Sequence, residues 1–348
     1  RPVLASADDT ENVTPIISLD GSNSLLTDEN SNVEKASGPV DYELPDSVND
    51  GCILHAWDWF YKDVKSKMAD IAAAGFTAVQ ISPLQPNKDS PVQGTSQWWK
   101  FYQPVDFRVG SYLGGADDFK AMCDEAHKYG VKVIVDVVAN HLANSAGRDD
   151  GKFNNAQMRN SAIPDWLKND DQYWHINDLG GTSDGDRYMM TNGPIGMPDL
   201  NTGNEKLQDY ILKYLNDAQD LGADGFRFDA AKHIELPSDG SFGSQFWPKI
   251  VNGTKAKNSN VFLYGEILNT AGPISIGEYT KYIRVTNNVY GHAIQNVLKD
   301  GNKNVGGAVT MSNNNFGSDP NTWVTWVESH DTYAGEYGDK TIGISGND

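Results

Sequence analysis

An alternation of short apolar segments with amphipathic segments begins near residue 51 and constrains the fold more than any other feature. Residues 131–138 are the clearest apolar segment, because their β-branched side chains occupy both faces, as in a strand buried within a parallel sheet. Strands that alternate with helices pair in parallel, and such a series favours an α/β fold of the (β/α)8 TIM barrel type over an open sheet. The predicted strands are 51–56, 78–81, 131–138, 225–229, 261–265, 285–289 and 323–328, and the predicted helices are 63–74, 116–129, 204–221, 242–253, 275–283 and 291–300.

Two stretches interrupt this alternation. Residues 141–200 are rich in Trp, Asn, Gly and Asp and are too long for an ordinary connection between a strand and a helix, so we predict an inserted domain after the third strand. Residues 1–45 are rich in Ser, Asn, Asp and Glu, which predicts a flexible leader or linker. The barrel would then comprise residues 46–140 and 201–348. Its eighth strand has no obvious place, which favours a fragment of a longer protein.

Charge and composition exclude several classes of partner. Lys and Arg number 28 against 47 Asp and Glu, which gives 28 − 47 = −19. This charge argues against nucleic acid and against an anionic membrane surface, although it is equally explained by solubility alone. No apolar run reaches the roughly 18 residues that span a bilayer. Cys52 and Cys123 each lie in a segment with the pattern of a buried element, so we expect free buried thiols, with a disulfide as the alternative.

Four segments bring polar clusters to the carboxyl ends of predicted strands, namely 136–141, 225–233, 265–267 and 328–331. A single cluster of this kind is readily explained as a loop or helix cap. Four of them at successive strand ends are difficult to explain by packing, and the carboxyl ends of the strands are where a barrel of this type carries its active site.

Two carboxylates in these clusters suit the hydrolysis of a glycosidic bond. Asp229 and Glu266 come from adjacent strands, which lie roughly 4.8 Å apart, and a retaining glycosidase holds its two carboxyls about 5–5.5 Å apart. Arg227 lies two residues before Asp229 and therefore on the same strand face, where we expect it to hold Asp229 ionised. Glu266 would start protonated, with a pKa raised by its negative neighbour and a partly dry cleft.

The sequence resembles glycoside hydrolase family 13, the α-amylase family, over about residues 50–345, and it is most similar to secreted bacterial members. Four short regions of that family occur in order at 136–141, 225–233, 265–267 and 329–331, and a fifth resembles 197–201, Met-Pro-Asp-Leu-Asn. The resemblance implies a nucleophile, an acid/base and a third carboxylate, in that order Asp229, Glu266 and Asp331. It also implies substrate contacts from Tyr102, Gln103, His141, Arg227, Lys232, His233 and His330.

The same resemblance implies an endo-acting, secreted α-amylase that cleaves α-1,4 bonds of starch and acts outside the cell, and we expect a monomer. It further implies a structural Ca²⁺ held by side-chain oxygens of Asn140 and Asp199 and by the backbone carbonyl of His233. The leading sequence Ala5-Ser6-Ala7 matches a signal-peptide cleavage site, with a pro-segment as the alternative. One departure is that the family's eighth strand and C-terminal β domain are not evident.

Three other functions compete with this interpretation. A glucanotransferase or maltogenic enzyme of the same family would use the same carboxylates, and the sequence does not separate it from an amylase. A non-catalytic sugar-binding relative would typically lack one of the three carboxylates, which are all present. A metal-dependent hydrolase on another barrel would need a pair of metal-binding histidines such as His-x-His on the first strand, and His55-Ala56-Trp57 lacks the second one.

Overall fold

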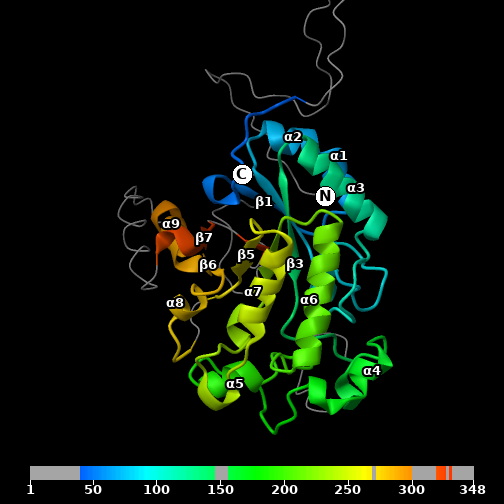
Figure 1. The fold of residues 1–348 in the computed structure, drawn as a ribbon, viewed down its shortest axis with the longest axis vertical. Coiled ribbons are helices and arrows are strands. Elements are labelled where there is room, and N and C mark those ends of the chain that lie inside the picture. The colour runs from blue at the N-terminus through cyan, green and yellow to red at the C-terminus, as the bar shows by residue number, and fades with distance from the viewer. Residues whose placement is uncertain (1–39, 146–155, 269–271, 300–318, 327–328, 331–348) are drawn as a thin grey trace, which may run out of the picture.

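The computed structural model describes residues 40–145, 156–268, 272–299, 319–326 and 329–330. Within these ranges, seven strands form one parallel sheet in which each strand pairs with the next along the chain (Figure 1). The strands are β1 (Ile53–Ala56), β2 (Ala78–Ile81), β3 (Lys132–Val137), β4 (Gly225–Phe228), β5 (Phe262–Gly265), β6 (Arg284–Asn287) and β7 (Trp323–Thr325). This order is that of consecutive strands in a (β/α)8 barrel, and it confirms the predicted fold class. Of the predicted leader, 1–45, only residues 40–45 are among the described residues. The last 18 residues of the chain, which follow the seventh predicted strand, lie outside the described residues.

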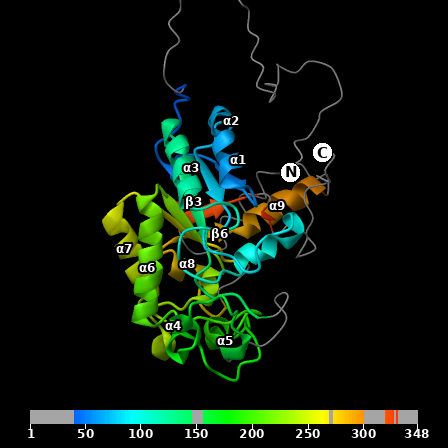
Figure 2. The same ribbon diagram turned by 90° about the vertical axis from the view of Figure 1, so that its right-hand side faces the viewer.

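Helices follow the strands and form the outer layer (Figures 1 and 2). They are α1 (Tyr61–Ser66), α2 (Met68–Ala73), α3 (Ala116–Lys128), α6 (Glu205–Asp220), α7 (Phe246–Lys257), α8 (Ile276–Tyr279) and α9 (Asn288–Lys299). The single helix predicted over 63–74 is two helices, because Lys67 leaves helical geometry at φ −101°, ψ 4°. The helix predicted over 275–283 covers only four residues.

The core lies between the sheet and these helices. On α6, the buried residues Leu207, Ile211, Leu215 and Ala218 recur at intervals of three and four, which places them on one face of the helix. Full burial of each large apolar side chain contributes about 1.5–3 kcal/mol. The β3 strand is buried from Val133 onwards, as its apolar pattern predicted.

The segment between β3 and α6 interrupts the alternation of strands and helices, and we refer to it as the inserted subdomain. It contains the short helices α4 (Asp165–Lys168) and α5 (Arg187–Asn192), which lie beyond the first turns of α6 and α7 (Figures 1 and 2). Its two ends meet in an isolated antiparallel bridge between His141 and Asp199. In such a fold the helices begin near the carboxyl ends of the strands. The subdomain lies at this end of α6 and α7, so it covers the end of the sheet that carries the polar clusters.

The two cysteines differ from expectation in one respect. Both are free thiols, but only Cys123 on α3 is buried, whereas Cys52 is exposed and precedes β1. The prediction of a buried Cys52 was wrong because β1 begins at Ile53, two residues later than the predicted strand, so that Cys52 lies before the sheet. Among the described residues, no helix is both long and apolar enough to cross a membrane.

Candidate active site

Arg227 on β4 is the centre of a network of charged side chains at the end of the sheet. Its Nη1 donates to Asp136 on β3, at 2.8 and 3.0 Å from the two carboxylate oxygens, and to Asp229 Oδ1 at 2.9 Å. The register of the sheet pairs Asp136 directly with Arg227. The Tyr102 hydroxyl donates to Asp136 Oδ2 at 2.8 Å. The Asp136 side chain is 0% exposed and that of Asp229 is 16% exposed, so only Asp229 of this pair is open to a substrate.

Asp229 and Glu266 emerge from neighbouring strands at the same level. Phe228 pairs with Gly265, so the residues that follow each of them are side by side. The backbone N–H of Glu266 donates to Phe228 O at 2.8 Å. Ala230 adopts a left-handed conformation (φ 49°) and directs its N–H to Glu266 Oε2 at 2.8 Å. This turn therefore fixes the Glu266 carboxylate beside the strand that carries Asp229.

The close approach of the two strand ends depends on Gly265. A Cβ atom at this position would lie 2.6 Å from Ala231 Cβ and 2.7 Å from Ile283 Cδ1, both shorter than any normal contact. Any larger residue would therefore push the turn after β4 away from β5. Glycine at position 265 therefore allows Glu266 to lie close to the turn that carries Asp229.

Burial raises the pKa of Asp229 well above its ordinary value, and the negative charges of Glu266 and Asp136 add to this shift. Arg227 acts in the opposite direction. The predicted contact between Arg227 and Asp229 is present, but desolvation outweighs it. The carboxyl is therefore harder to ionise than the sequence suggested.

Aromatic rings form one wall of the site. His330 is 7% exposed and stacks on Tyr102, with ring centroids 5.3 Å apart and planes 21° apart. The ring centroids of Trp57 and Trp98 lie 5.9 and 5.7 Å from the ring centroid of His330. Burial lowers the pKa of His330 well below its usual range, so its ring is neutral at neutral pH. Asp331, the predicted third carboxylate, follows His330 directly but lies outside the described residues.

His141 lies behind this wall. Its ring is 1% exposed, and its Nε2 is 3.0 Å from the backbone carbonyl of Tyr102. The structure thus brings His141, Tyr102 and His330 together, and their contact with substrate stays a prediction.

The turn after β4 carries the two basic residues predicted for the leaving-group side. Lys232 Nζ is 3.0 Å from Asp184 Oδ1 in the inserted subdomain and 3.2 Å from Leu268 O, two residues beyond Glu266. His233 Nδ1 is 2.8 Å from Met190 O on α5. Burial lowers the pKa of His233 to about 4, so the neutral ring donates this hydrogen bond at neutral pH.

Gln103 is not part of the carboxylate network. It is 2% exposed, and its Oε1 accepts hydrogen bonds from Lys88 Nζ at 3.2 Å and from the N–H of Asn144 at 3.2 Å. Lys88 is itself buried and also contacts Asn144 Oδ1 at 2.6 Å. Gln103 thus ties the loop after β2 to the start of the inserted subdomain. Its contact with substrate stays a prediction.

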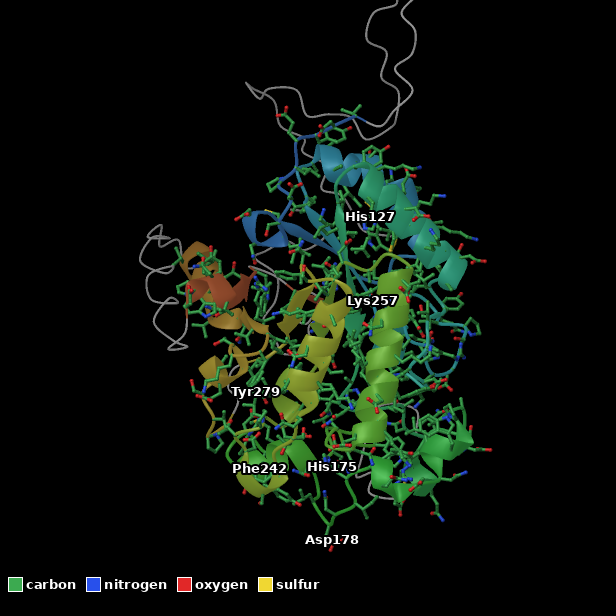
Figure 3. The ribbon with its side chains drawn as sticks, viewed as in Figure 1. His127, His175, Asp178, Phe242, Lys257 and Tyr279 are labelled. Carbon is green, nitrogen blue, oxygen red and sulfur yellow. The ribbon has the colours of Figure 1, made fainter. Side chains whose placement is uncertain are left out.

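The proposed metal ligands lie at the joint between barrel and inserted subdomain. The amide of Asn140 is 3.2 Å from Asp199 Oδ1, and both residues are buried. His175, labelled in Figure 3, contacts Asp199 Oδ2 at 2.6 Å. Burial raises the pKa of Asp199 to about 6. A desolvated carboxylate beside an amide fits a cation that prefers oxygen ligands, such as Ca²⁺. Across the described ranges, no group of three or more His, Cys, Asp or Glu side chains is arranged to hold a metal.

Two functional candidates were missed by sequence reasoning. Asp136 was recognised only as part of a motif, although its place one residue before the end of β3 puts it opposite Arg227. Arg187 was missed altogether, and its side chain makes several hydrogen bonds at the joint with the inserted subdomain. A charged residue at the start of a short helix gives no distinctive sequence signal.

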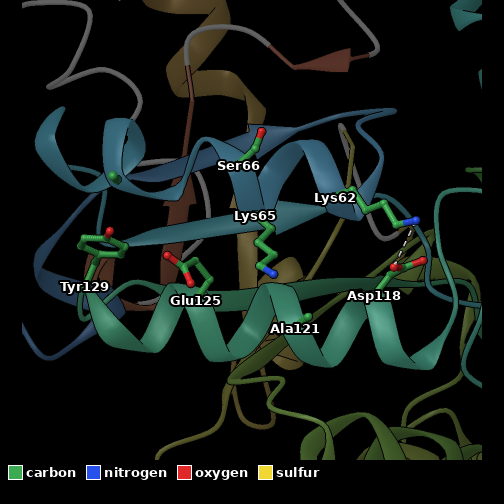
Figure 4. Close-up of a pocket in the computed structure, with 8 residues that line it drawn as sticks. Lys62, Lys65, Ser66, Asp118, Ala121, Glu125 and Tyr129 are labelled. Atoms are coloured by element: carbon green, nitrogen blue, oxygen red, sulfur yellow. Dashed lines mark ion pairs between the residues drawn. The ribbon is translucent and has the colours of Figure 1, made fainter. Parts of the chain in front are cut away.

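A groove lies elsewhere, on the outer layer between α1 and α3 (Figure 4). It is open and is bordered by charges of both signs, including the ion pair of Lys62 and Asp118 at 3.7 Å. It has no connection to the carboxylates described above, and we assign it no role.

A parallel barrel with paired carboxylates at the carboxyl ends of β4 and β5 is an arrangement suited to glycoside hydrolysis. Residues 44–289 match the family model described as the α-amylase catalytic domain, and the chain belongs to this family.

Curated relatives carry the same family name. The chain is 37% identical over 297 residues to an α-amylase of Clostridium acetobutylicum, a match that covers 84% of this chain and 37% of the relative. It is 36% identical over 319 residues to an α-amylase of Butyrivibrio fibrisolvens, covering 83% of this chain and 32% of the relative. The matched part is thus about a third of the length of either relative.

Solved structures share the fold. The α-amylase I of Eisenia fetida aligns with a TM-score of 0.66 and 21% identity, covering 85% of this chain and 60% of the other. A cyclomaltodextrin glucanotransferase aligns with a TM-score of 0.64 and 19% identity, covering 83% of this chain and 65% of the other. At this identity the likeness concerns the barrel alone and does not separate hydrolysis from glucan transfer.

Proposed function

We propose that this chain is the catalytic part of an endo-acting α-amylase, which hydrolyses α-1,4-glucosidic bonds in starch and related glucans with retention of configuration. The observation that carries the proposal is the placement of Asp229 and Glu266 at the same level on paired neighbouring strands. Strands about 4.8 Å apart bring two carboxyls to the separation of about 5–5.5 Å used by retaining glycosidases. The family names of the relatives support the choice of substrate.

In this proposal Asp229 is the nucleophile. Its carboxylate attacks the anomeric carbon while Glu266 donates a proton to the leaving oxygen, so that one C–O bond forms as another breaks. Glu266 then removes a proton from a water molecule, which attacks the same carbon and releases Asp229. Two inversions at one carbon give net retention. Arg227 and the Ala230 N–H keep the two carboxyls in place throughout.

Other residues are proposed to bind the sugar. Tyr102 and His330 form a stacked pair whose aromatic surface suits the C–H face of a glucose ring. Lys232 and His233 are proposed for the leaving-group side, which is supported by the reach of Lys232 to the backbone beyond Glu266. Asp331 is proposed as the third carboxylate, because His330 directly before it belongs to the aromatic wall.

We further propose a structural Ca²⁺ held by side-chain oxygens of Asn140 and Asp199 and by the backbone carbonyl of His233. When bound, the ion would supply the positive charge that the buried Asp199 carboxylate needs and would tie the inserted subdomain to the barrel. An extracellular location is proposed because a starch polymer is too large to enter a cell intact. A monomer is proposed because Asp229, Glu266 and Arg227 all come from one chain.

Incubation with soluble starch tests the proposed function. An endo-acting hydrolase should lower the polymer size early, while reducing ends accumulate in step with the bonds that are cut. A glucanotransferase would redistribute chain lengths or form cyclic products with few new reducing ends. Size-exclusion chromatography together with a reducing-end assay separates these outcomes, and Asp217→Asn on the exposed face of α6 is a matched control for variants of the site.

A further inference from the structure

Arg187 is the first residue of α5 in the inserted subdomain, yet its side chain is buried against the barrel. Its guanidinium binds Asp239 in a bidentate manner, with Nε 2.9 Å from Oδ1 and Nη2 2.8 Å from Oδ2. The Asp239 side chain is 0% exposed and that of Arg187 is 7% exposed. Asp239 also accepts a hydrogen bond from the N–H of Leu236 at 2.6 Å. Asp239 thus connects Arg187 to the backbone of the segment that follows β4.

The remaining donors of Arg187 reach the backbone of that same segment. Nη1 is 2.6 Å from Lys232 O, and Nη2 is 2.6 Å from the hydroxyl of Tyr279 at the end of α8 (Tyr279 is labelled in Figure 3). The Tyr279 hydroxyl in turn lies 3.0 Å from Lys232 O and 2.7 Å from Ile234 O. Side chains from α5 and α8 thus converge on the carbonyl groups on either side of His233.

The segment held in this way carries Lys232, whose ammonium contacts Leu268 O beside the strand end of Glu266. A lysine side chain is flexible, so its position depends on how firmly its backbone is fixed. Arg187 contacts neither Asp229 nor Glu266 in the hydrogen bonds described above. Its influence on a reaction would therefore pass through Lys232.

We propose that Arg187 is a positioning residue that sets the leaving-group side of the cleft by fixing the backbone of Lys232. The inference rests on the proposed function and deepens it, because it assigns a determinant of how the departing glucan chain is bound. A lysine at position 187 would keep the positive charge but lose the planar fork that binds Asp239 and Lys232 O together.

The test compares two substrates with Arg187→Lys in the full chain. Maltoheptaose places sugar units on both sides of the bond that is cut, whereas 4-nitrophenyl α-maltotrioside, cut at its aryl bond, places none on the leaving-group side. We expect kcat/KM for maltoheptaose to fall about tenfold or more, because small misplacements of binding groups are costly, and kcat/KM for the aryl substrate to change by less than about threefold. The ratio of the two values does not depend on how much of the variant is folded.

Two further variants make the test specific. Tyr279→Phe removes the hydroxyl that binds both carbonyls while keeping the ring, and it should shift the ratio in the same direction. Arg159→Lys is the matched control, because Arg159 is a buried arginine of the same subdomain that binds Lys168 O at 2.6 Å and Asp171 at 2.9 Å instead of the segment after β4. In a Lys232→Met background, Arg187→Lys should cause no further change in the ratio.

The outcomes separate the inference from the proposed function. If the wild-type chain cleaves neither substrate, the proposed function fails and the inference falls with it. If the wild type cleaves both but Arg187→Lys and Tyr279→Phe leave the ratio at its wild-type value, the proposed function stands and the positioning role is overturned. A ratio that shifts equally in Arg159→Lys would also overturn it, because the effect would then belong to the subdomain as a whole.

Discussion

Replacing Asp229 by asparagine removes one negative charge and leaves the shape of the side chain almost unchanged. The structure indicates that the surrounding network would survive, because Arg227 keeps both of its contacts with Asp136, at 2.8 and 3.0 Å. An amide cannot serve as the nucleophile in a double displacement. We therefore expect the rate of starch hydrolysis to fall by at least ~10⁴, which corresponds to roughly 5 kcal/mol of activation free energy.

The same substitution should not lower the stability of the protein at neutral pH. Burial raises the pKa of Asp229, and a carboxyl with a raised pKa opposes folding once the pH exceeds its unfolded value of about 3.9. The stability of the protein with this carboxyl protonated is fully present below that pH, and it is lost as the pH rises through the folded pKa. Asp229→Asn should therefore melt at or above the wild-type temperature at pH 7, and this advantage should shrink towards pH 4.

A reducing-end assay on soluble starch and a melting curve at the two pH values measure both effects. Asp217→Asn on α6 should change neither, since its partner Lys213 lies with it on the exposed surface. Turnover by Asp229→Asn within tenfold of wild type would refute the assignment of the nucleophile. A marked loss of melting temperature at pH 7 would refute the electrostatic reasoning.

Three further predictions follow from the contacts of the site. Since burial raises the pKa of Asp229, the acid limb of kcat/KM should lie above the ordinary aspartate value of about 4, as a pH–rate profile would show; an acid limb below pH 4 would contradict this. EDTA should lower the melting temperature by several degrees, because an ion at a hundredfold excess over its Kd contributes about 2.7 kcal/mol; Asp199→Asn should abolish the response to added calcium, and an unchanged response would remove Asp199 from the site. Asp136→Asn should lower kcat at least about tenfold with little change in KM, because Asp136 is buried and supports Arg227 and Tyr102 without reaching substrate; steady-state kinetics would test this, and an effect confined to KM would contradict it.

The order of the strands was predictable because each buried parallel strand is a compact apolar run that ends in polar residues. The segment 131–138 shows this, since its burial pattern follows directly from its composition. That Asp229 and Glu266 lie side by side was also predictable, because both are at the carboxyl ends of neighbouring strands. The break between α1 and α2 at Lys67 was not, because the apolar spacing continues across it.

The contacts that position the site were largely hidden from the sequence. Arg187 and Asp239 are 52 residues apart, and nothing in the local pattern around either residue indicates the other. The raised pKa of Asp229 depends on how deeply the turn after β4 is buried, which is a property of the folded chain. Gln103 was assigned to the substrate by resemblance, and the contacts of its Oε1 with Lys88 and Asn144 could not be predicted from the sequence.

The central claim is that Asp229 and Glu266 act as a retaining pair, and the anomeric form of the first products tests it most directly. Carboxyls on neighbouring strands leave no room for a water molecule between Asp229 and the sugar, so two successive displacements must occur at the anomeric carbon. Proton NMR during the first minutes of maltoheptaose hydrolysis, before mutarotation, should show new reducing ends in the α-anomeric form. New ends that appear in the β form would contradict the account.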